Sequence, residues 1–348
     1  MLTRFYVVAA VLILAGAAVA GEQAATVRQS GGRILLEYDH AIRAVINPQH
    51  GGEISGLSVM IDGEWQELIY RAADYSDQAG WRGKAPVLWP ATGVTISKTG
   101  GRFSYTTDDR LYEMPMHGFA RTHAWDVLAS KASGDSATTR LGLTDTDRTR
   151  SLYPFGFNLQ VEYSVDRCGL QIHYQVAANS DNRWAMPFSI GNHITFRLPL
   201  VEASSAEETR FQTNLPQEYI LDSRRVFTGR TRPSRYTGQH RVGELPHRRA
   251  ISLGGDVDRA YVRIVEPSGF FVTLSHRVPD GVPARTVLFN LWADLEEGFF
   301  SPEPWLGAQN SLNSGYGLVS LPPGRTWDWR IRIQPSTLDD CDKETARP

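Results

Sequence analysis

The stretch that decides the fold runs from Phe157 to Val165 and reads Phe-Asn-Leu-Gln-Val-Glu-Tyr-Ser-Val. Every second residue in it is apolar, and the residues between them are polar or charged. A period of two places the apolar side chains on one face of a β-strand and the polar ones on the other. After a turn at Asp166–Gly169, the same alternation continues in Leu170, Ile172, Tyr174 and Val176. The two runs predict an antiparallel hairpin with one buried face.

The same pattern recurs along most of the chain. Further strands are predicted at Ile34–Tyr38, Ala41–Ile46, Leu57–Ile61, Phe103–Thr106, Thr138–Leu143, Tyr261–Val265, Phe270–Leu274 and Trp327–Ile333. No helix-period segment of convincing length follows residue 20. Many strands separated by Gly and Pro turns predict an all-β fold, a large antiparallel β-sandwich. No clear linker interrupts them, which favours a single domain over residues 26–336 and a polar, mobile tail over 337–348.

The N-terminus has the pattern of a signal peptide over residues 1–20. Arg4 precedes an apolar run, Phe5–Ala17, and Ala18-Val19-Ala20 then matches the small-x-small pattern of a cleavage site. The run is shorter than the roughly 18 residues that indicate a transmembrane helix. We therefore expect an exported, soluble protein, periplasmic or secreted, without membrane attachment once the signal is removed.

Charge and cysteine content limit the partners. The 36 basic and 38 acidic residues nearly balance, so electrostatics gives no reason to expect nucleic acid as a partner. The basic residues of Arg224–Arg249 are spread among Thr, Ser, Pro and Gly, which favours a solvated loop over a phosphate site. Cys168 and Cys341 would tie the C-terminal tail to a hairpin tip if they paired in an oxidising compartment, but the sequence leaves free thiols equally open. The oligomeric state is not predicted.

Two histidines and a glutamate stand in unusually apolar surroundings. His117 lies in Met-Pro-Met-His-Gly-Phe-Ala-Arg (114–121), His193 in Met-Pro-Phe-Ser-Ile-Gly-Asn-His-Ile-Thr-Phe (186–196), and Glu303 between two prolines. Burial would shift the proton affinity of each side chain. Two imidazoles and a carboxylate can perform paired acid and base chemistry without a metal or cofactor. We expect neither, although a metal site built from both histidines and a carboxylate remains an alternative.

Four segments, taken in order, resemble the aldose 1-epimerase (galactose mutarotase) family, most closely its bacterial branch. They are Trp81–Pro90 with its Arg-Gly pair, Met116–Arg121 (Met-His-Gly-Phe-Ala-Arg) followed by Trp125, Met186–His193, and Glu303-Pro304-Trp305. The resemblance extends from about Arg33 to Ile333. It implies a twisted sandwich of the galactose mutarotase-like kind, whose sugar-binding cleft interconverts the α and β anomers of a free aldohexose without a cofactor.

The resemblance also implies roles for individual residues. Glu303 would be the base that takes the proton from the anomeric hydroxyl. His193 would be the acid that protonates the ring oxygen, and His117 would donate a hydrogen bond to that oxygen. For sugar binding, the resemblance points to Arg82 and to Asp258, with Asp256 as the competing choice, and Trp305 is a candidate for stacking on the sugar.

The residue types suit this chemistry independently of the resemblance. Ring opening removes a proton at O1 and delivers one at O5, so a base and an acid must both reach the hemiacetal. Burial should raise the pKa of Glu303 above its ordinary value of about 4.3, which makes it a stronger base. A nearby carboxylate should keep one histidine charged, so that this histidine acts as the acid.

One departure from the family pattern falls beside the proposed acid. Ile194-Thr195 follows His193 where the family usually has Pro and an aromatic residue. The change leaves open a sugar other than glucose or galactose, or a non-catalytic carbohydrate-binding protein on the same fold. A hexose-6-phosphate 1-epimerase-like enzyme is a further alternative.

Overall fold

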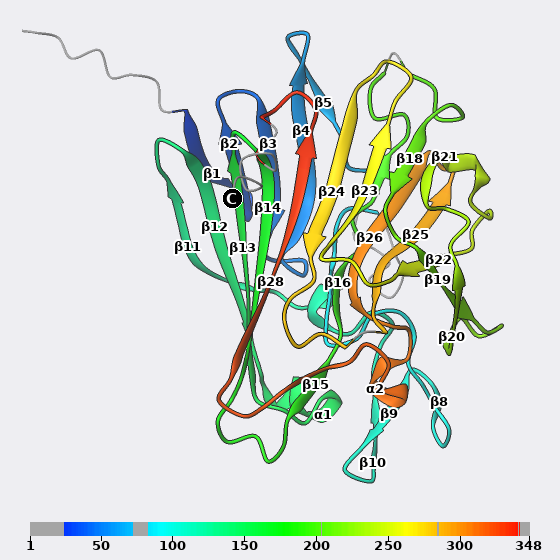
Figure 1. Ribbon diagram of the computed structural model, residues 1–348. Coiled ribbons are helices and arrows are strands. Elements are labelled where there is room, and N and C mark those ends of the chain that lie inside the picture. The colour runs from blue at the N-terminus through cyan, green and yellow to red at the C-terminus, as the bar shows by residue number, and fades with distance from the viewer. Residues whose placement is uncertain (1–23, 72–82, 203, 284, 340, 342–348) are drawn as a thin grey trace, which may run out of the picture.

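The computed structural model of the chain describes residues 24–71, 83–202, 204–283, 285–339 and 341 (Figure 1). Nearly all of its regular elements are strands, and every pair between named strands is antiparallel, as the sequence predicted. The predicted signal peptide and residues 342–348 of the predicted tail lie outside the described residues. In the part of the chain that the structure describes, no helix has the length and apolarity needed to cross a membrane.

A nine-stranded sheet forms the longest layer of the molecule. The predicted hairpin lies within it, paired from Phe157↔Ala178 to Asp166↔Gly169, and its first strand buries every second side chain. In spatial order the sheet contains β11 (Asp126–Ala132), β12 (Ser136–Thr144), β13 (Phe157–Asp166), β14 (Gly169–Ala178), β28 (Thr326–Pro335), β24 (Phe271–Arg277), β23 (Arg259–Val265), β18 (Arg210–Thr213) and β21 (Gly238–Arg241).

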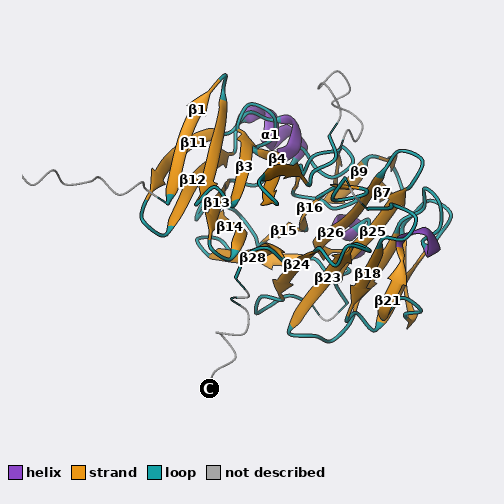
Figure 2. Cartoon of the chain, turned by 90° about the horizontal axis from the view of Figure 1, so that it is seen from above, coloured by secondary structure: helices purple, strands orange, loops and turns teal. Residues whose placement is uncertain are grey.

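Two further sheets pack against this layer (Figure 2). A five-stranded sheet lies against β11–β13 and contains β1 (Ala25–Ser30), β2 (Arg33–Tyr38), β3 (Ile42–Asn47), β4 (Glu53–Ile61) and β5 (Glu64–Glu67). An eight-stranded sheet lies against β23 and β24 and contains β20 (Phe227–Pro233), β19 (Gln217–Leu221), β22 (Ile251–Gly254), β25 (Val287–Asp294), β26 (Phe299–Gly307), β16 (Ile190–Asn192), β6 (Val87–Leu88) and β17 (Phe196–Arg197).

The remaining described elements are short. Three two-stranded sheets join β7 (Ile96–Ser97) to β8 (Gly101–Arg102), β9 (Ser104–Thr107) to β10 (Arg110–Glu113), and β15 (Met186–Phe188) to β27 (Val319–Leu321). The helices are α1 (Asp147–Leu152) and α2 (Ser311–Ser314), with 3-10 turns η1 (Ala120–Thr122) and η2 (Val242–Glu244). Strands therefore carry almost all of the buried structure.

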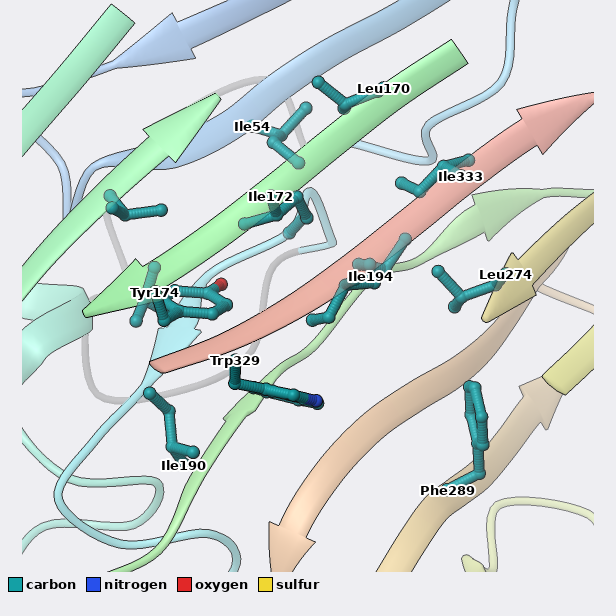
Figure 3. Close-up of a cluster of buried hydrophobic side chains, with 14 of the residues drawn as sticks. Ile54, Leu170, Ile172, Tyr174, Ile190, Ile194, Leu274, Phe289, Trp329 and Ile333 are labelled. Carbon is teal, nitrogen blue, oxygen red and sulfur yellow. The ribbon is translucent and has the colours of Figure 1, made fainter. Parts of the chain in front are cut away.

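The core fills the space between the layers (Figure 3). Tyr174 and Trp329 stack there with ring centroids 5.7 Å apart, and Ile190 and Ile194 are fully buried beside them. Burying these side chains removes them from water, the main favourable contribution to folding. Ile190 and Ile194 flank His193 in sequence, so the core fixes the backbone on both sides of that histidine.

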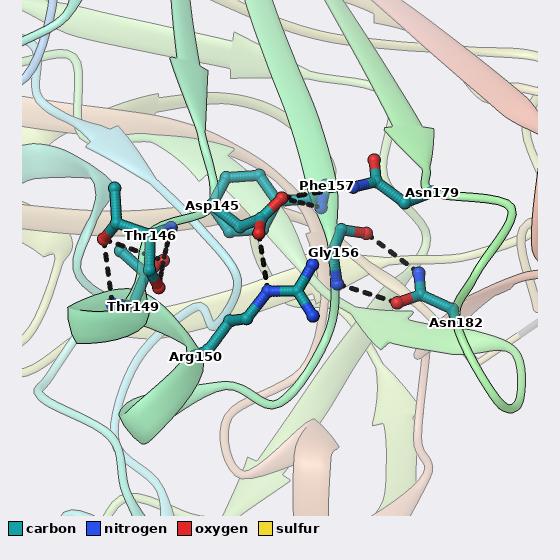
Figure 4. Close-up of polar contacts among 8 residues, drawn as sticks. All are labelled: Asp145, Thr146, Thr149, Arg150, Gly156, Phe157, Asn179 and Asn182. Carbon is teal, nitrogen blue, oxygen red and sulfur yellow. Dashed lines mark hydrogen bonds and ion pairs between the residues drawn. The ribbon is translucent and has the colours of Figure 1, made fainter.

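A polar cluster holds the end of the β13–β14 hairpin opposite its turn (Figure 4). The Asp145 carboxylate accepts hydrogen bonds from the Phe157 N–H (2.9 Å), the Asn179 amide (3.2 Å) and Arg150 Nε (2.6 Å). Thr146 and Thr149 close a reciprocal capping box at the start of α1. These bonds anchor the point at which the chain leaves β14 for the segment that carries His193.

Two expectations about the chain's periphery need correction. The basic segment around Arg224–Arg249 is not only a loop, since it contains β20 and β21, which form edge strands of the two largest sheets with mostly exposed side chains. The C-terminal segment is also fastened at its beginning, because Cys168 and Cys341 form a disulfide and Arg167 pairs with Asp339 at 3.0 Å. Both anchors lie at the β13–β14 turn.

Candidate active site

Strand β26 provides three side chains to the site from alternate positions. Ser301, Glu303 and Trp305 are two residues apart, so all three project from the same face of the strand. Each contacts a different partner: Ser301 reaches Thr195, Glu303 reaches His193, and Trp305 packs against His117. One strand thus aligns the whole site.

The backbone opposite β26 explains how this strand tolerates Pro302 and Pro304. β26 pairs with β16 at Trp305 and Leu306, and with β17 at Phe299 and Phe300, so the ladder on this edge is interrupted between Phe300 and Trp305. Prolines cannot donate ladder hydrogen bonds, which is why they are rare in central strands. The interruption coincides with residues 193–195, whose backbone amides at His193 and Thr195 instead donate to Pro86 O and Lys84 O, each at 3.0 Å.

His193 points towards the glutamate from that interrupted segment. Its neighbours Asn192 and Ile194 face the core, where the Asn192 amide donates to the Tyr174 hydroxyl at 2.8 Å. His193 therefore faces the other way, and its Nε2 lies 3.4 Å from Glu303 Oε1. Trp292 presents its ring edge-on to the imidazole, with centroids 5.9 Å apart.

Glu303 is a buried carboxyl held by two neutral donors. It is 1% exposed, its Oε1 accepts from Asn290 Nδ2 at 3.1 Å, and its Oε2 accepts from Trp305 Nε1 at 3.2 Å. Burial raises the pKa of Glu303 to about 8, although the two hydrogen bonds favour the carboxylate and oppose the shift. The direction agrees with the prediction from sequence.

His117 is held in an uncommon backbone conformation. Its φ is +64°, in the left-handed region that residues other than glycine seldom adopt. Gly93 holds it from two sides, because the Gly93 N–H donates to His117 Nδ1 at 3.1 Å and the His117 N–H donates to Gly93 O at 2.9 Å. Since Nδ1 is an acceptor, the neutral ring carries its proton on Nε2 and can donate from there. Its ring centroid lies 5.6 Å from that of His193.

The expectation that a carboxylate keeps one histidine charged is not supported. Burial, assisted by the charge of Arg121, lowers the pKa of His117 to about 3. Burial also lowers the pKa of His193 well below its ordinary value, and the neighbouring His117 adds to that effect. Desolvation outweighs the attraction of Glu303 because the carboxyl is itself neutralised by burial. Burial therefore favours the uncharged form of both partners, a protonated Glu303 beside a neutral His193.

The three predicted sugar-binding residues differ in their placement relative to the Glu303–His193 pair. Arg82 is outside the described residues, but the residues just after it run alongside His193, as the hydrogen bonds to Lys84 O and Pro86 O show. Asp258 and its competitor Asp256 are exposed at the start of β23, and no contact among the described residues joins either carboxylate to the Glu303–His193 pair. Trp305 is 1% exposed and serves as a hydrogen-bond donor to Glu303, so it offers little ring surface to a sugar.

Three further residues of the site were not predicted from the sequence. Thr195 and Ser301 could have been found from their spacing, since Thr195 lies two residues from His193 and Ser301 lies two residues from Glu303 on the same face of β26. Asn290 could not, because it reaches Glu303 only through the Asn290↔Glu303 register of β25 and β26. Among the described residues, the only potential metal-binding trio is His247, Asp294 and Glu296, which is separate from this site.

The antiparallel sandwich is the fold of galactose mutarotase-like proteins. The sequence profile of the family described as aldose 1-epimerase matches residues 33–265. The chain belongs to the aldose 1-epimerase family.

The chain is also similar to individual proteins in sequence and in fold. The chromosomally encoded protein LacX of Lactococcus lactis subsp. lactis is 26% identical over 292 residues, which cover 78% of this chain and 87% of LacX. A galactose mutarotase related enzyme from Lactobacillus acidophilus has the same fold, with a TM-score of 0.69 at 20% identity over 91% of this chain and 98% of that one. A galactose mutarotase-like protein from Clostridium acetobutylicum gives 0.72 at 19% identity, over 90% and 98%.

Proposed function

We propose that this chain is an aldose 1-epimerase that interconverts the α and β anomers of a free aldohexose. The observation that carries the proposal is the 3.4 Å approach of His193 Nε2 to Glu303 Oε1 in a buried site next to His117. Anomerisation requires a base and an acid at two oxygens bonded to the same carbon. Two proton carriers this close together can serve both oxygens at once.

In the proposed reaction, the pair transfers its single proton in a cycle. The reactive form has the proton on His193 Nε2, which leaves Glu303 as a carboxylate. Glu303 takes the proton from the anomeric hydroxyl while His193 protonates the ring oxygen, and the C1–O5 bond breaks to give the open-chain aldehyde. Rotation about C1–C2 and reclosure with the roles reversed gives the other anomer and returns the proton to its starting position.

His117 and the hydrogen-bond donors around Glu303 have supporting roles in this scheme. The Nε2–H of His117 would donate to the ring oxygen, which stabilises the charge that develops on ring opening. Asn290 and Trp305 hold the glutamate and favour its carboxylate form. Substrate contacts by Arg82 and Asp258 remain part of the proposal, as does export of the chain to the periplasm or the medium.

Polarimetry of freshly dissolved α-glucose and α-galactose tests the function. Wild type should accelerate mutarotation of at least one of them, and Glu303→Gln should lower kcat/KM by about 10²–10⁴-fold, the usual contribution of a positioned acid or base. The same measurement with a hexose 6-phosphate tests the phosphosugar alternative. No acceleration with any of a panel of aldoses and phosphosugars would refute the enzyme proposal.

Glu266→Gln is a matched control. Glu266 is also a buried glutamate, 2% exposed, and its carboxylate accepts hydrogen bonds from Leu200 N and Thr209 Oγ1, away from the proposed chemistry. This variant should mutarotate sugars at the wild-type rate. If wild type binds galactose by calorimetry but leaves mutarotation at the spontaneous rate, the non-catalytic carbohydrate-binding alternative is correct.

A further inference from the structure

We propose that Thr195 and Ser301 are positioning residues that fix His193 as the Nδ1–H tautomer, with Nε2 directed at Glu303. The proposal rests on the proposed function for its consequence in catalysis, but the tautomer itself is a property of the folded chain. It also gives a role to Thr195, one of the two residues that depart from the family pattern.

The two hydroxyls lie directly behind the imidazole. Thr195 Oγ1 is 3.3 Å from His193 Nδ1 and donates to the His193 carbonyl oxygen at 3.1 Å. Ser301 Oγ donates to Thr195 Oγ1 at 2.9 Å. Both Thr195 and Ser301 are fully buried. Thr195 lies two residues after His193 in the segment between β16 and β17, and Ser301 lies two residues before Glu303 on the same face of β26.

Counting protons assigns the tautomer. A threonine hydroxyl has one proton to donate and two lone pairs with which to accept. A carbonyl oxygen can only accept, so the contact with His193 O takes the single Thr195 proton. The contacts with Ser301 and with His193 Nδ1 must then both be accepted by Thr195 Oγ1. His193 Nδ1 is therefore the donor, and in the neutral ring Nε2 carries the lone pair.

This tautomer is the one that the chemistry needs. With the lone pair on Nε2, the ring can take the shared proton from Glu303 and then deliver it from the same atom to the ring oxygen. The opposite tautomer would place a fixed N–H at Nε2, and the imidazole could not receive a proton there. A partner that holds a catalytic histidine in the correct tautomer is a known contribution to rate.

Nitrogen NMR of the histidine side chains tests the proposal directly. In protein labelled with ¹⁵N-histidine, long-range ¹H–¹⁵N spectra near pH 7 should show His193 with a protonated Nδ1 and an unprotonated Nε2. His193→Gln identifies the signals. Thr195→Val, which keeps the shape but removes the hydroxyl, should move His193 to the Nε2–H form or to a mixture of both. Thr195→Ser, which keeps the hydroxyl, should retain the wild-type pattern.

Thr139→Val is the matched control for losing a buried hydroxyl. Thr139 is 1% exposed, its Oγ1 donates to Ala129 O at 3.2 Å, and it lies 2.8 Å from Ser130 Oγ. It has the same serine–threonine–carbonyl arrangement, but in the β11–β12 hairpin instead of the site (Figure 1). The His193 spectrum should not change in this variant. If Thr195→Val leaves Ser301 unpaired and fails to fold, Thr195→Val/Ser301→Ala removes both hydroxyls and takes its place.

Kinetics then separates this inference from the proposed function. Thr195→Val should lower kcat by roughly 10–100-fold with KM changed less than about threefold, and Thr195→Ser should restore most of the loss. If wild type turns over sugar while Thr195→Val keeps both its kcat and its His193 tautomer, the positioning role is wrong and the enzyme proposal stands. If wild type is inactive but the tautomer changes as expected, the enzyme proposal is wrong and the hydrogen-bond arrangement stands.

Discussion

At the scale of single residues, burial acts in opposite directions on the two members of the Glu303–His193 pair. It raises the pKa of the glutamate to about 8 and lowers the pKa of the histidine, because both charged forms lose hydration. The sequence could predict the first shift, from two prolines and a tryptophan around Glu303. It could not predict that desolvation would dominate at His193, since that depends on the packing of His117 and Trp292 around the ring.

The pair's single proton predicts the shape of the pH profile. Above about pH 8 the pair loses its last proton, so His193 can no longer act as an acid and kcat/KM should fall about tenfold per pH unit. Below about pH 8, kcat/KM should stay constant until the pH at which the Glu303–His193 pair takes up a second proton. The measurement is mutarotation under substrate-limited conditions from pH 5 to 10. A rate that instead rises through pH 8 would show that Glu303 works as a base without His193 as its acid.

Trp305→Phe should lower the plateau of that pH profile and move its alkaline limb to higher pH. It removes the Nε1 donor to Glu303 Oε2, so the carboxylate is less favoured and the pKa of Glu303 rises further. The plateau should drop about tenfold, because the proton stays on the glutamate, while the alkaline limb moves to higher pH. At high pH the two profiles should converge, since the protonation of His193 is then the only requirement.

Trp329→Phe is the control for losing an indole in the core. Trp329 is equally buried and donates its Nε1 proton to His276 Nδ1 at 3.3 Å, away from Glu303. The alkaline limb of the kcat/KM profile of Trp329→Phe should coincide with that of wild type. If both variants shift the limb alike, general loosening of the core would explain the effect better than the lost hydrogen bond.

At the scale of elements, the strands that could be predicted are those with one buried face and one solvent-facing side. β13 and β14 alternate because one side meets the core and the other meets water. β26 does not alternate, since all nine of its residues are buried and it carries two prolines. A central strand with Pro302 and Pro304 contradicts sequence rules, and it exists here because the partner strand is interrupted opposite them. The site lies at this irregularity, so its geometry could not be derived from periodicity.

The disulfide at the end of β28 should stabilise the fold without affecting the site. Cys168 and Cys341 are separated by 173 positions in the sequence, and their disulfide joins the segment after β28 to the β13–β14 turn. Cys168→Ala/Cys341→Ala should lower the free energy of unfolding by about 2–4 kcal/mol, because the open chain has more freedom when unfolded. Urea unfolding checks this, with mutarotation expected to stay at the wild-type rate. A reductant should lower the midpoint of wild type only, and equal midpoints for the variant and for wild type without reductant would contradict the stabilising role.

At the scale of the whole molecule, the layered sandwich provides the site with burial. The nine-stranded sheet supports the eight-stranded sheet from one side, so residues of β26 are shielded from water. Sequence patterns predicted the fold class, and motif order singled out Glu303, His193 and His117, which lie together in the structure. Neither could predict that the Asn290 amide reaches Glu303, because the two residues belong to separate strands that meet only after the sheet forms.

Burial of Glu303 should also have a cost in stability that grows with pH. In the folded chain its pKa is about 8, well above its ordinary value of about 4.3, so between these values the native state holds a proton that the unfolded state has lost. The unfolded state is then favoured as pH rises, by roughly 1.4 kcal/mol per pH unit.

Glu303→Gln cannot titrate and should gain stability relative to wild type steadily from pH 5 to 8, with no further gain above that. Lost hydrogen bonds to Asn290 and Trp305 would shift the variant's curve by a constant amount, so the informative quantity from urea unfolding is the slope of the difference. Parallel curves for the two proteins would mean that Glu303 is ionised in the folded chain, and the one-proton pair would then be wrong as well.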